Sequence, residues 1–274
     1  MKDPRKYLED LLARSQESPA SDALNNFFQA TGISLEDLGE HYAKDLKAFV
    51  GVFRDILEWA YLVWVVEKVL VEDYRKYLFV KDGRLAQTGV KDEFRTKLRE
   101  YFGRKDLLLV GVSKRSRLLA EGLTSLVMAK LFAEVRGAFL LQVPETLMEK
   151  AYRYERQWDA DFQGAFVMGR RYVARLFEST FRPREGIVIL DLPPHLKEED
   201  AIRVAKSLKS HRSVLYKGSL GPIVEAHGKA SVAKPLATRV EDEVLARLRE
   251  SFGEAFARKI AEWLRLAERE VSRG

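Results

Sequence analysis

Short runs of uninterrupted aliphatic residues place the strongest constraint on how this chain folds. Leu107–Val112 contains no polar residue, and Gly186–Leu190 is a second run of the same kind. Both are short for a helix, and a strand without polar alternation is typical of a sheet that is covered on its faces. We therefore predict an α/β fold with buried strands at these two places.

The first quarter of the chain, by contrast, predicts helices only. A short helix around Leu24 should end at Gly32, since glycine commonly follows the last turn of a helix. A longer helical pattern then runs to about Tyr74, with Gly51 as a candidate break. We expect residues 1–75 to form a helical region ahead of the strands.

Strands and helices alternate through the rest of the chain, 76–274. The expected strands are Tyr77–Lys81, Leu107–Val112, Ala138–Val143, two segments within Phe162–Phe177, and Gly186–Leu190. The expected helices are Lys91–Phe102, Arg115–Phe132, Glu198–Leu208, Pro222–Ser231 and a long charged amphipathic helix over Glu241–Glu270. No flexible linker separates the two regions, so they are expected to form one continuous domain.

Composition excludes several classes of site. The chain has no cysteine, which removes disulfides, thiolate zinc sites and cysteine nucleophiles. Its net charge of +6 suits a polyanionic partner without requiring one. The most apolar run, Trp59–Val66, is far shorter than the ~20 apolar residues that span a bilayer. Met1–Ser15 lacks the apolar segment of a signal peptide, so we expect a cytoplasmic protein without a membrane partner.

A carboxylate follows the first expected strand, at Asp82-Gly83. A carboxylate at the end of a strand is held rigidly and can bind a hard cation such as Mg²⁺ or Mn²⁺. Hydrolysis of phosphodiesters by metal ions needs such carboxylates to position the attacking water. The simpler interpretation is a turn, because Asp-Gly is common after a strand.

A cluster of cations follows the second expected strand. Lys114, Arg115 and Arg117 come directly after Gly111-Val112-Ser113, where a helix is expected to begin. The N–H groups of a helix start, together with these cations, could hold a phosphate. The Gly-Lys-Ser/Thr ending of a Walker P-loop is absent, so we do not expect ATP hydrolysis by this chain. A solvated basic helix start is the alternative.

Two further residues could take part in chemistry. Asp191 follows the strand Gly186–Leu190 much as Asp82 follows the first strand, so the two could converge at one edge of the sheet. His227 lies on a short expected helix after a glycine-rich turn and could bind a metal or carry a proton. Each has a structural alternative, Asp191 as the start of a proline turn and His227 as an ordinary packed histidine.

Taken in order, these segments resemble the NurA family, nucleases that work with the HerA hexameric DNA translocase in DNA end resection. The resembling segments are Asp82-Gly83-Arg84-Leu85, Gly111-Val112-Ser113-Lys114-Arg115-Ser116, Ile189-Leu190-Asp191-Leu192-Pro193 and Pro222-Ile223-Val224-Glu225-Ala226-His227. They spread over about half of the chain. Each motif is weak alone, and the ordered set is considerably stronger.

The resemblance implies an RNase H-like mixed sheet flanked by helices. It also implies a deoxyribonuclease that depends on Mn²⁺ or Mg²⁺, acts in double-strand break repair, and docks as a homodimer on a HerA-type ATPase. Carried over, it assigns catalysis to Asp82, Glu58 and His227, metal binding to Asp82, Glu58 and Asp191, and nucleic-acid binding to Lys114, Arg115 and Arg117.

The helix carboxylate of the family has two candidates in this chain. Glu58 fits best by its surroundings, with Arg54 before it and Ala60 after it, and Glu67 is the competitor. Burying a carboxylate without a partner is costly, which favours a functional or a paired role for Glu58.

The chain also departs from the family pattern. The family opens with a strand ending in Asp-Gly-Ser that supplies a first metal ligand, and no such segment precedes Asp82. The arginine and glutamate of a later Arg-x-Glu-x-Pro segment are Ile189 and Asp191 here, and Ser219-Leu220-Gly221 replaces a tyrosine before the histidine helix. One alternative is therefore a degenerate subunit that docks on the translocase and binds DNA without cutting. Another is an unrelated basic binding module.

Overall fold

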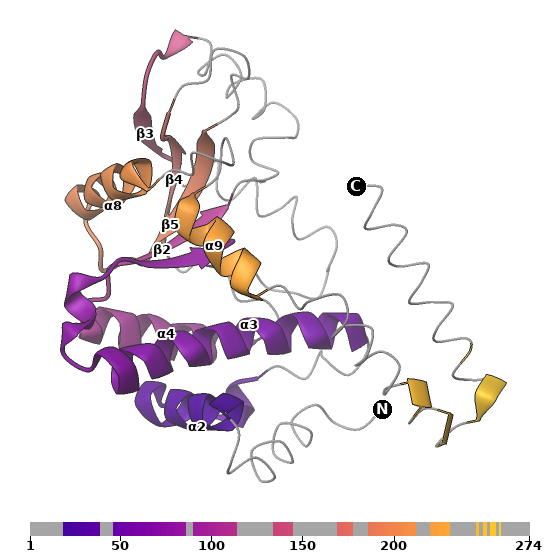
Figure 1. Cartoon of the computed structure of the whole chain (residues 1–274). Coiled ribbons are helices and arrows are strands. Elements are labelled where there is room, and N and C mark those ends of the chain that lie inside the picture. The colour runs from indigo at the N-terminus through magenta and orange to yellow at the C-terminus, as the bar shows by residue number, and fades with distance from the viewer. Residues whose placement is uncertain are drawn as a thin grey trace. The chain divides into compact units, whose positions relative to one another are not determined.

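The computed structural model describes residues 19–38, 46–85, 90–113, 134–144, 169–177, 186–211 and 220–230, with a few residues between 245 and 258. The chain divides into two compact units, Met1–Gly221 and Pro222–Gly274. The first unit contains the sheet and every labelled helix of Figure 1 that precedes residue 221. The described part of the second unit is mainly the helix α9 (Gly221–Ala230).

Helices form the described start of the first unit. They are α2 (Pro19–Thr31), the 3-10 helix η1 (Leu35–Asp37), α3 (Leu46–Trp64), its continuation as the π-helix η3 (Val65–Leu70), and the 3-10 helix η4 (Asp73–Lys76). As predicted, α2 is followed by Gly32, whose φ of +69° is left-handed. α3 runs through Gly51 without a break, because one glycine costs a helix only about 1 kcal/mol and packing against α2 offsets it.

A five-stranded mixed sheet follows, as the α/β prediction requires. Its strands are β1 (Phe79–Asp82), β2 (Leu109–Ser113), β3 (Phe139–Gln142), β4 (Arg170–Arg175) and β5 (Ile187–Leu192). They lie in the order β1-β2-β5-β4-β3, with β1 and β2 parallel and every other neighbouring pair antiparallel. β2 and β5 are buried at every residue, which confirms the interpretation of the two aliphatic runs.

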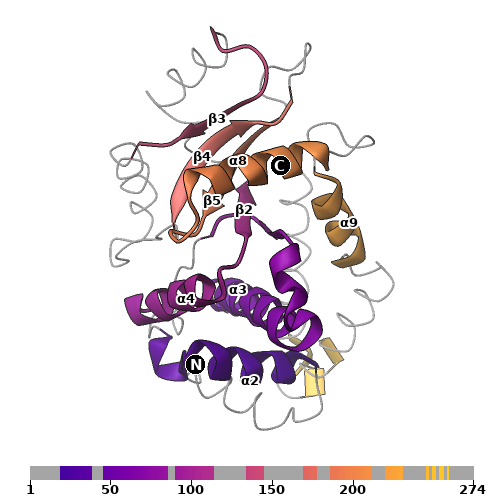
Figure 2. The same ribbon diagram turned by 90° about the vertical axis from the view of Figure 1, so that its left-hand side faces the viewer.

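Two further helices flank this sheet (Figure 2). α4 (Asp92–Lys105) connects the parallel strands β1 and β2, and α8 (Glu198–Ser210) follows β5. α4 passes Gly103, where we expected it to end, and stops at Asp106 with φ +51°. Aspartate is one of the few residues other than glycine that tolerates this left-handed conformation.

The hydrophobic core joins α2, α3 and α4 to the β1–β2 side of the sheet. Trp59 of α3 and Phe102 of α4 are both fully buried, with ring centroids 5.5 Å apart. Phe27 and Phe94 make a similar contact between α2 and α4 at 6.0 Å. Leu109 belongs to the same cluster, so the helical layer and β2 share one core.

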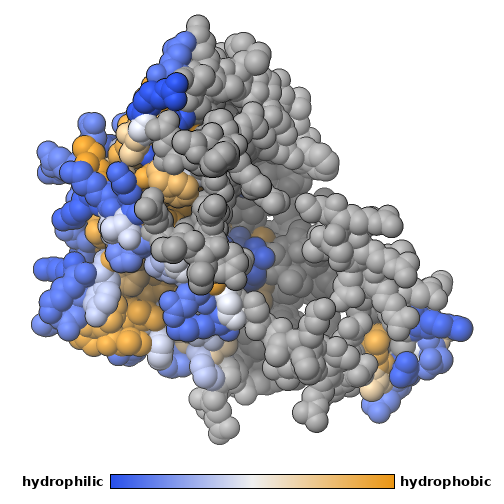
Figure 3. Space-filling view, turned by 45° about the horizontal axis from the view of Figure 1, so that its top comes forward, coloured by the Kyte–Doolittle hydropathy of each residue, from blue (hydrophilic) through white to orange (hydrophobic). Residues whose placement is uncertain are grey.

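Apolar and hydrophilic residues alternate over the described part of the face in Figure 3. No helix among the described residues is both long enough and apolar enough to cross a membrane.

The helix expected over 115–132 and the segment 162–168 lie outside the described residues. So does nearly all of the long helix expected over 241–270.

Candidate functional site

Three of the segments singled out in the sequence meet where β1, β2 and β5 lie side by side. Lys81 of β1 is opposite Gly111 of β2, and Gly111 is opposite Asp191 of β5. Arg171 of β4 continues the same row, opposite Asp191. Residues of one row share a face of the sheet, so Lys81, Asp191 and Arg171 project on the same side.

Asp82 and Asp191 belong to adjacent rows. Asp82 is opposite Val112, which is opposite Leu190, whereas Asp191 is opposite Gly111. Side chains alternate between faces along a strand, so the two carboxylates leave the sheet on opposite sides. Their segments converge, as the strand-end pattern predicts, but the register does not direct the two carboxylates into one site.

Asp191 is bound by Arg171. The Arg171 Nε lies 2.8 Å from Asp191 Oδ1, and its Nη2 lies 3.3 Å from Oδ2. Both side chains are only 1% exposed. The Leu85 N–H also donates to Oδ2, at 3.2 Å. The carboxylate is therefore desolvated, compensated by a guanidinium and hydrogen-bonded to the turn after β1.

Gly111 allows that turn to lie against β2. A Cβ at this position would lie 2.8 Å from the Gly83 oxygen and 2.8 Å from the Leu85 nitrogen. Gly83 has φ +99° and donates its N–H to the Val112 oxygen at 2.8 Å. The chain turns at Gly83, as the simpler interpretation of Asp82-Gly83 predicts. Asp82 itself is exposed at the end of β1.

Glu58 lies on α3 and forms an ion pair with Lys81. Arg54, one turn earlier, places its Nε 3.7 Å from the other carboxylate oxygen. The Lys81 ammonium also lies 5.4 Å from the centre of the Trp59 ring, and its side chain is 12% exposed. Lys81 therefore connects the sheet to α3. Glu58 is paired, but its side chain is 43% exposed, so the burial from which a partner was expected is not present.

Glu67, the competing helix carboxylate, is engaged by α4. It accepts a hydrogen bond from the Tyr101 hydroxyl at 2.8 Å and lies 2.9 Å from the Lys105 ammonium. Burial raises the pKa of Tyr101, and the hydrogen bond to Glu67 raises it further. The phenol therefore stays a proton donor, and Glu67 links the π-helix η3 to α4.

The structure does not describe the side chains of the remaining predicted site residues. Lys114, Arg115 and Arg117 lie outside the described residues. His227 lies on α9 in the second unit, and its side chain is outside the described part.

The described residues do not form a set of metal ligands. Within the described ranges, no three side chains of His, Asp or Glu lie together in a way that could hold a metal ion. Asp191 and Glu58 are instead paired with Arg171 and Lys81. The donor set expected for Mn²⁺ or Mg²⁺ thus does not fit what this part of the chain presents.

The decisive partner that sequence reasoning missed is Arg171. Its strand was expected within Phe162–Phe177, but the cation was not assigned to Asp191. A signal existed, since a carboxylate in a buried strand is costly unless a cation or hydrogen-bond donors compensate it. The register that places Arg171 opposite Asp191 could not be read from local pattern.

Comparisons with protein families, with curated proteins and with solved structures found no match to this chain. The NurA resemblance therefore stays a prediction from the ordered motifs.

Proposed function

We propose that this chain is a NurA-like DNA-binding subunit that acts beside a HerA-type hexameric ATPase in DNA end resection and binds DNA without cutting it. The ordered motifs support the family, and the mixed sheet is compatible with the RNase H-like fold that belongs to the proposal. The observation that carries the non-cutting role is the buried ion pair of Arg171 and Asp191.

That ion pair occupies a carboxylate that a catalytic member would offer to its metal. A metal ion bound by Asp191 would break the contact between that carboxylate and the Arg171 guanidinium. Removing one member of a buried pair costs about 3–5 kcal/mol. Lys81 compensates Glu58 in the same way, although that pair is more exposed. Two of the three expected metal ligands, Asp191 and Glu58, therefore act as structural anchors in this proposal.

DNA binding in this proposal comes from the basic segment after β2. Lys114, Arg115 and Arg117 follow a buried strand, and the whole chain carries a net charge of +6. Lysine and arginine that neutralise phosphates supply most of the affinity of non-specific DNA binding. A homodimer docked on the ATPase ring would present this segment to the DNA that the ring moves.

The direct test uses purified full-length chain with labelled linear duplex DNA, in Mn²⁺, Mg²⁺ or EDTA. We expect binding in all three conditions and no cleavage in any of them. The logarithm of the binding constant should fall linearly with the logarithm of salt concentration. Replacing Lys114, Arg115 and Arg117 together by glutamine should flatten that slope by about 0.9 for each lost contact with a phosphate of duplex DNA.

A matched control replaces Lys76, which is exposed and distant in sequence, by glutamine and should leave the slope unchanged. DNA binding that the triple variant retains in full would remove this segment from the proposal. Docking is tested separately, by co-migration of the chain with a HerA-type ATPase in size-exclusion chromatography. Light scattering of the chain alone tests the homodimer.

A metal-dependent nuclease is the second candidate, and the exposure of Asp82 at the end of β1 favours it. An exposed carboxylate at a strand end is accessible to an ion and to DNA, unlike Asp191. Cleavage that requires Mn²⁺ and disappears in Asp82→Ala would establish this candidate and exclude the non-cutting role.

A further inference from the structure

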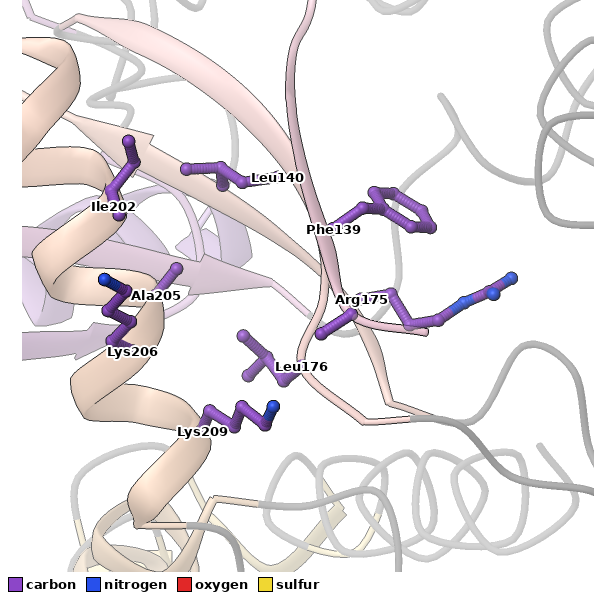
Figure 4. A pocket seen from close by; sticks show the side chains of 9 residues that line it. Phe139, Leu140, Arg175, Leu176, Ile202, Ala205, Lys206 and Lys209 are labelled. Carbon is purple, nitrogen blue, oxygen red and sulfur yellow. The ribbon is translucent and has the colours of Figure 1, made fainter. Parts of the chain in front are cut away.

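A groove of about 270 Å³ separates α8 from the outer strands of the sheet (Figure 4). Its walls come from β3, from the end of β4 and from one side of α8. Among the residues that the structure describes, none of those assigned to the nuclease motifs lines it. The residues on which its chemistry depends are Leu140, Leu176, Ile202, Ala205, Lys206 and Lys209.

The sheet side of the groove is aliphatic. Leu140 and Leu176 point toward α8, whereas Phe139 and Arg175 point away from it (Figure 4). The Arg175 guanidinium lies 5.1 Å from the centre of the Phe139 ring and donates to the Val135 oxygen. Among the described residues that line the groove, no aromatic ring points toward α8.

The helix side combines an apolar residue with two cations. Ile202, Lys206 and Lys209 are spaced three or four residues apart, so they lie along one side of α8. Ile202 is 42% exposed, which is unusual for a large aliphatic side chain beside a sheet. The opposite side of the helix packs inward through Ala201, Val204 and Leu208.

The two cations are not engaged by nearby acids. Within the described residues, neither Lys206 nor Lys209 has a carboxylate in ion-pair distance. In the first turn of α8, Asp200 is engaged locally: it pairs with Arg203 at 2.9 Å and accepts a hydrogen bond from the Lys197 N–H at the start of the helix. The groove therefore combines an aliphatic floor with a positive rim.

We propose that this groove binds an acidic segment of a partner protein. One or two aliphatic side chains of that segment lie between Leu140 and Ile202, and its carboxylates contact Lys206 and Lys209. The volume is below the roughly 300–1,000 Å³ of pockets that take drug-sized ligands, and it suits individual side chains. Charge complementarity selects an acidic partner over a basic one.

The same geometry favours a peptide over single-stranded nucleic acid as the occupant of the groove. Proteins that hold single strands without sequence preference stack successive bases on aromatic rings along a basic groove. The described side chains that face this groove are aliphatic ones and lysines, and the Phe139 ring points away from it. A nucleic acid could use the lysines but would gain nothing from Leu140, Leu176 and Ile202.

The test follows the methyl signals of isoleucine and leucine in the full-length chain by NMR, without DNA and without divalent ions. The probe is a synthetic peptide of alternating glutamate and leucine. Control peptides carry serine in place of leucine, or lysine in place of glutamate. We expect saturable shifts at Ile202, Leu140 and Leu176 with the glutamate–leucine peptide only.

Two charge-reversal variants make the test specific. Lys206→Glu combined with Lys209→Glu should weaken binding of the acidic peptide about tenfold, which is the scale of two exposed ion pairs. Lys76→Glu combined with Arg99→Glu changes the net charge equally on exposed helical positions outside the groove and should leave binding unchanged. Both variants alter surface residues, and their methyl spectra report directly whether they are folded.

Three outcomes overturn the proposal: no saturable shift at the groove methyls, equal binding of the lysine–leucine peptide, or tighter binding of a single-stranded oligothymidylate. Because the assay contains neither duplex DNA nor metal, its failure would leave the proposed DNA-binding role untouched. Conversely, loss of DNA binding on replacing Lys114 would not contradict peptide binding in the groove.

Discussion

Replacing Arg171 by methionine should be among the most destabilising single changes in this chain. Methionine fills much of the space of the arginine stem but has no donor for the Asp191 carboxylate. That carboxylate, 1% exposed, would keep only the Leu85 N–H at 3.2 Å. A charge left in that state either remains unpaired or takes up a proton, and both outcomes weaken the fold.

The expected loss is about 3–5 kcal/mol, the usual cost of removing one partner of a buried ion pair. Domains are typically stable by about 5–15 kcal/mol, so a large part of the total would disappear. Changing both partners together, Arg171→Met with Asp191→Leu, removes the desolvated charges as well as their attraction. Such replacements are often neutral or stabilising, so the double variant should be far more stable than either single variant.

Urea unfolding of the wild type, both single variants and the double variant gives the coupling between the two side chains. The midpoints should move while the dependence on urea stays constant, because the surface exposed on unfolding hardly changes. A single variant that loses less than ~1 kcal/mol would refute the buried pair. Mn²⁺ provides a second check, since a metal bound by Asp191 in the native protein would stabilise the wild type and not Asp191→Leu. We expect no such stabilisation.

Three other changes test separate parts of the structure, each by urea unfolding. Gly111→Ala should cost roughly 1–3 kcal/mol, since its Cβ would lie 2.8 Å from backbone atoms of the turn after β1; an unchanged midpoint would contradict that close approach. Burial raises the pKa of Asp37, but hydrogen bonds from Lys97 and from the Ser34 N–H outweigh it and lower the pKa overall. The folded value then lies below the unfolded value of about 3.9, so Asp37 contributes stability above that pH and loses it as pH falls through the folded value. Asp37→Asn should be less stable than the wild type at neutral pH and should remove this part of the acid dependence, and parallel pH profiles would exclude it. Val71 has φ +50° and ψ −89°, a conformation that a β-branched residue rarely adopts, so Val71→Gly should be as stable as the wild type or more stable by up to ~1 kcal/mol, and a clear loss would show that the conformation is unstrained.

The elements of this fold could be predicted from local pattern, and the pairing between them could not. The two aliphatic runs predict β2 and β5 to within two residues at each end; they are Leu107–Val112 and Gly186–Leu190. A short aliphatic run of that length fits few other kinds of secondary structure. The end of α4 was misplaced at Gly103, since Asp106 supplied the left-handed residue instead. The end of a helix depends on the backbone conformation of a single residue, so the local sequence predicts it poorly.

The same holds for the candidate site: its residues could be predicted from local pattern, but their arrangement in space could not. Asp82 and Asp191, which lie in the last residues of β1 and β5, were found by their position in the sequence. Their faces depend on register, and a shift of one residue in the pairing of β2 with β5 would place them on the same side of the sheet. Register is decided by contacts between segments far apart in the chain, as between Leu85 and Asp191. A single sequence does not reveal which distant segments make those contacts.

The position of β5 has a consequence for how the chain folds during synthesis. Among the described strands β5 is the last in sequence, yet it lies between β2 and β4 at the centre of the sheet. Until residue 192 has been made, β2 and β4 each expose an edge of unpaired N–H and C=O groups, and β2 is aliphatic as well. Such edges can pair with other chains, and non-local pairing is slow. The emerging chain therefore passes through a stage at which association competes with folding, and insertion of β5 ends it.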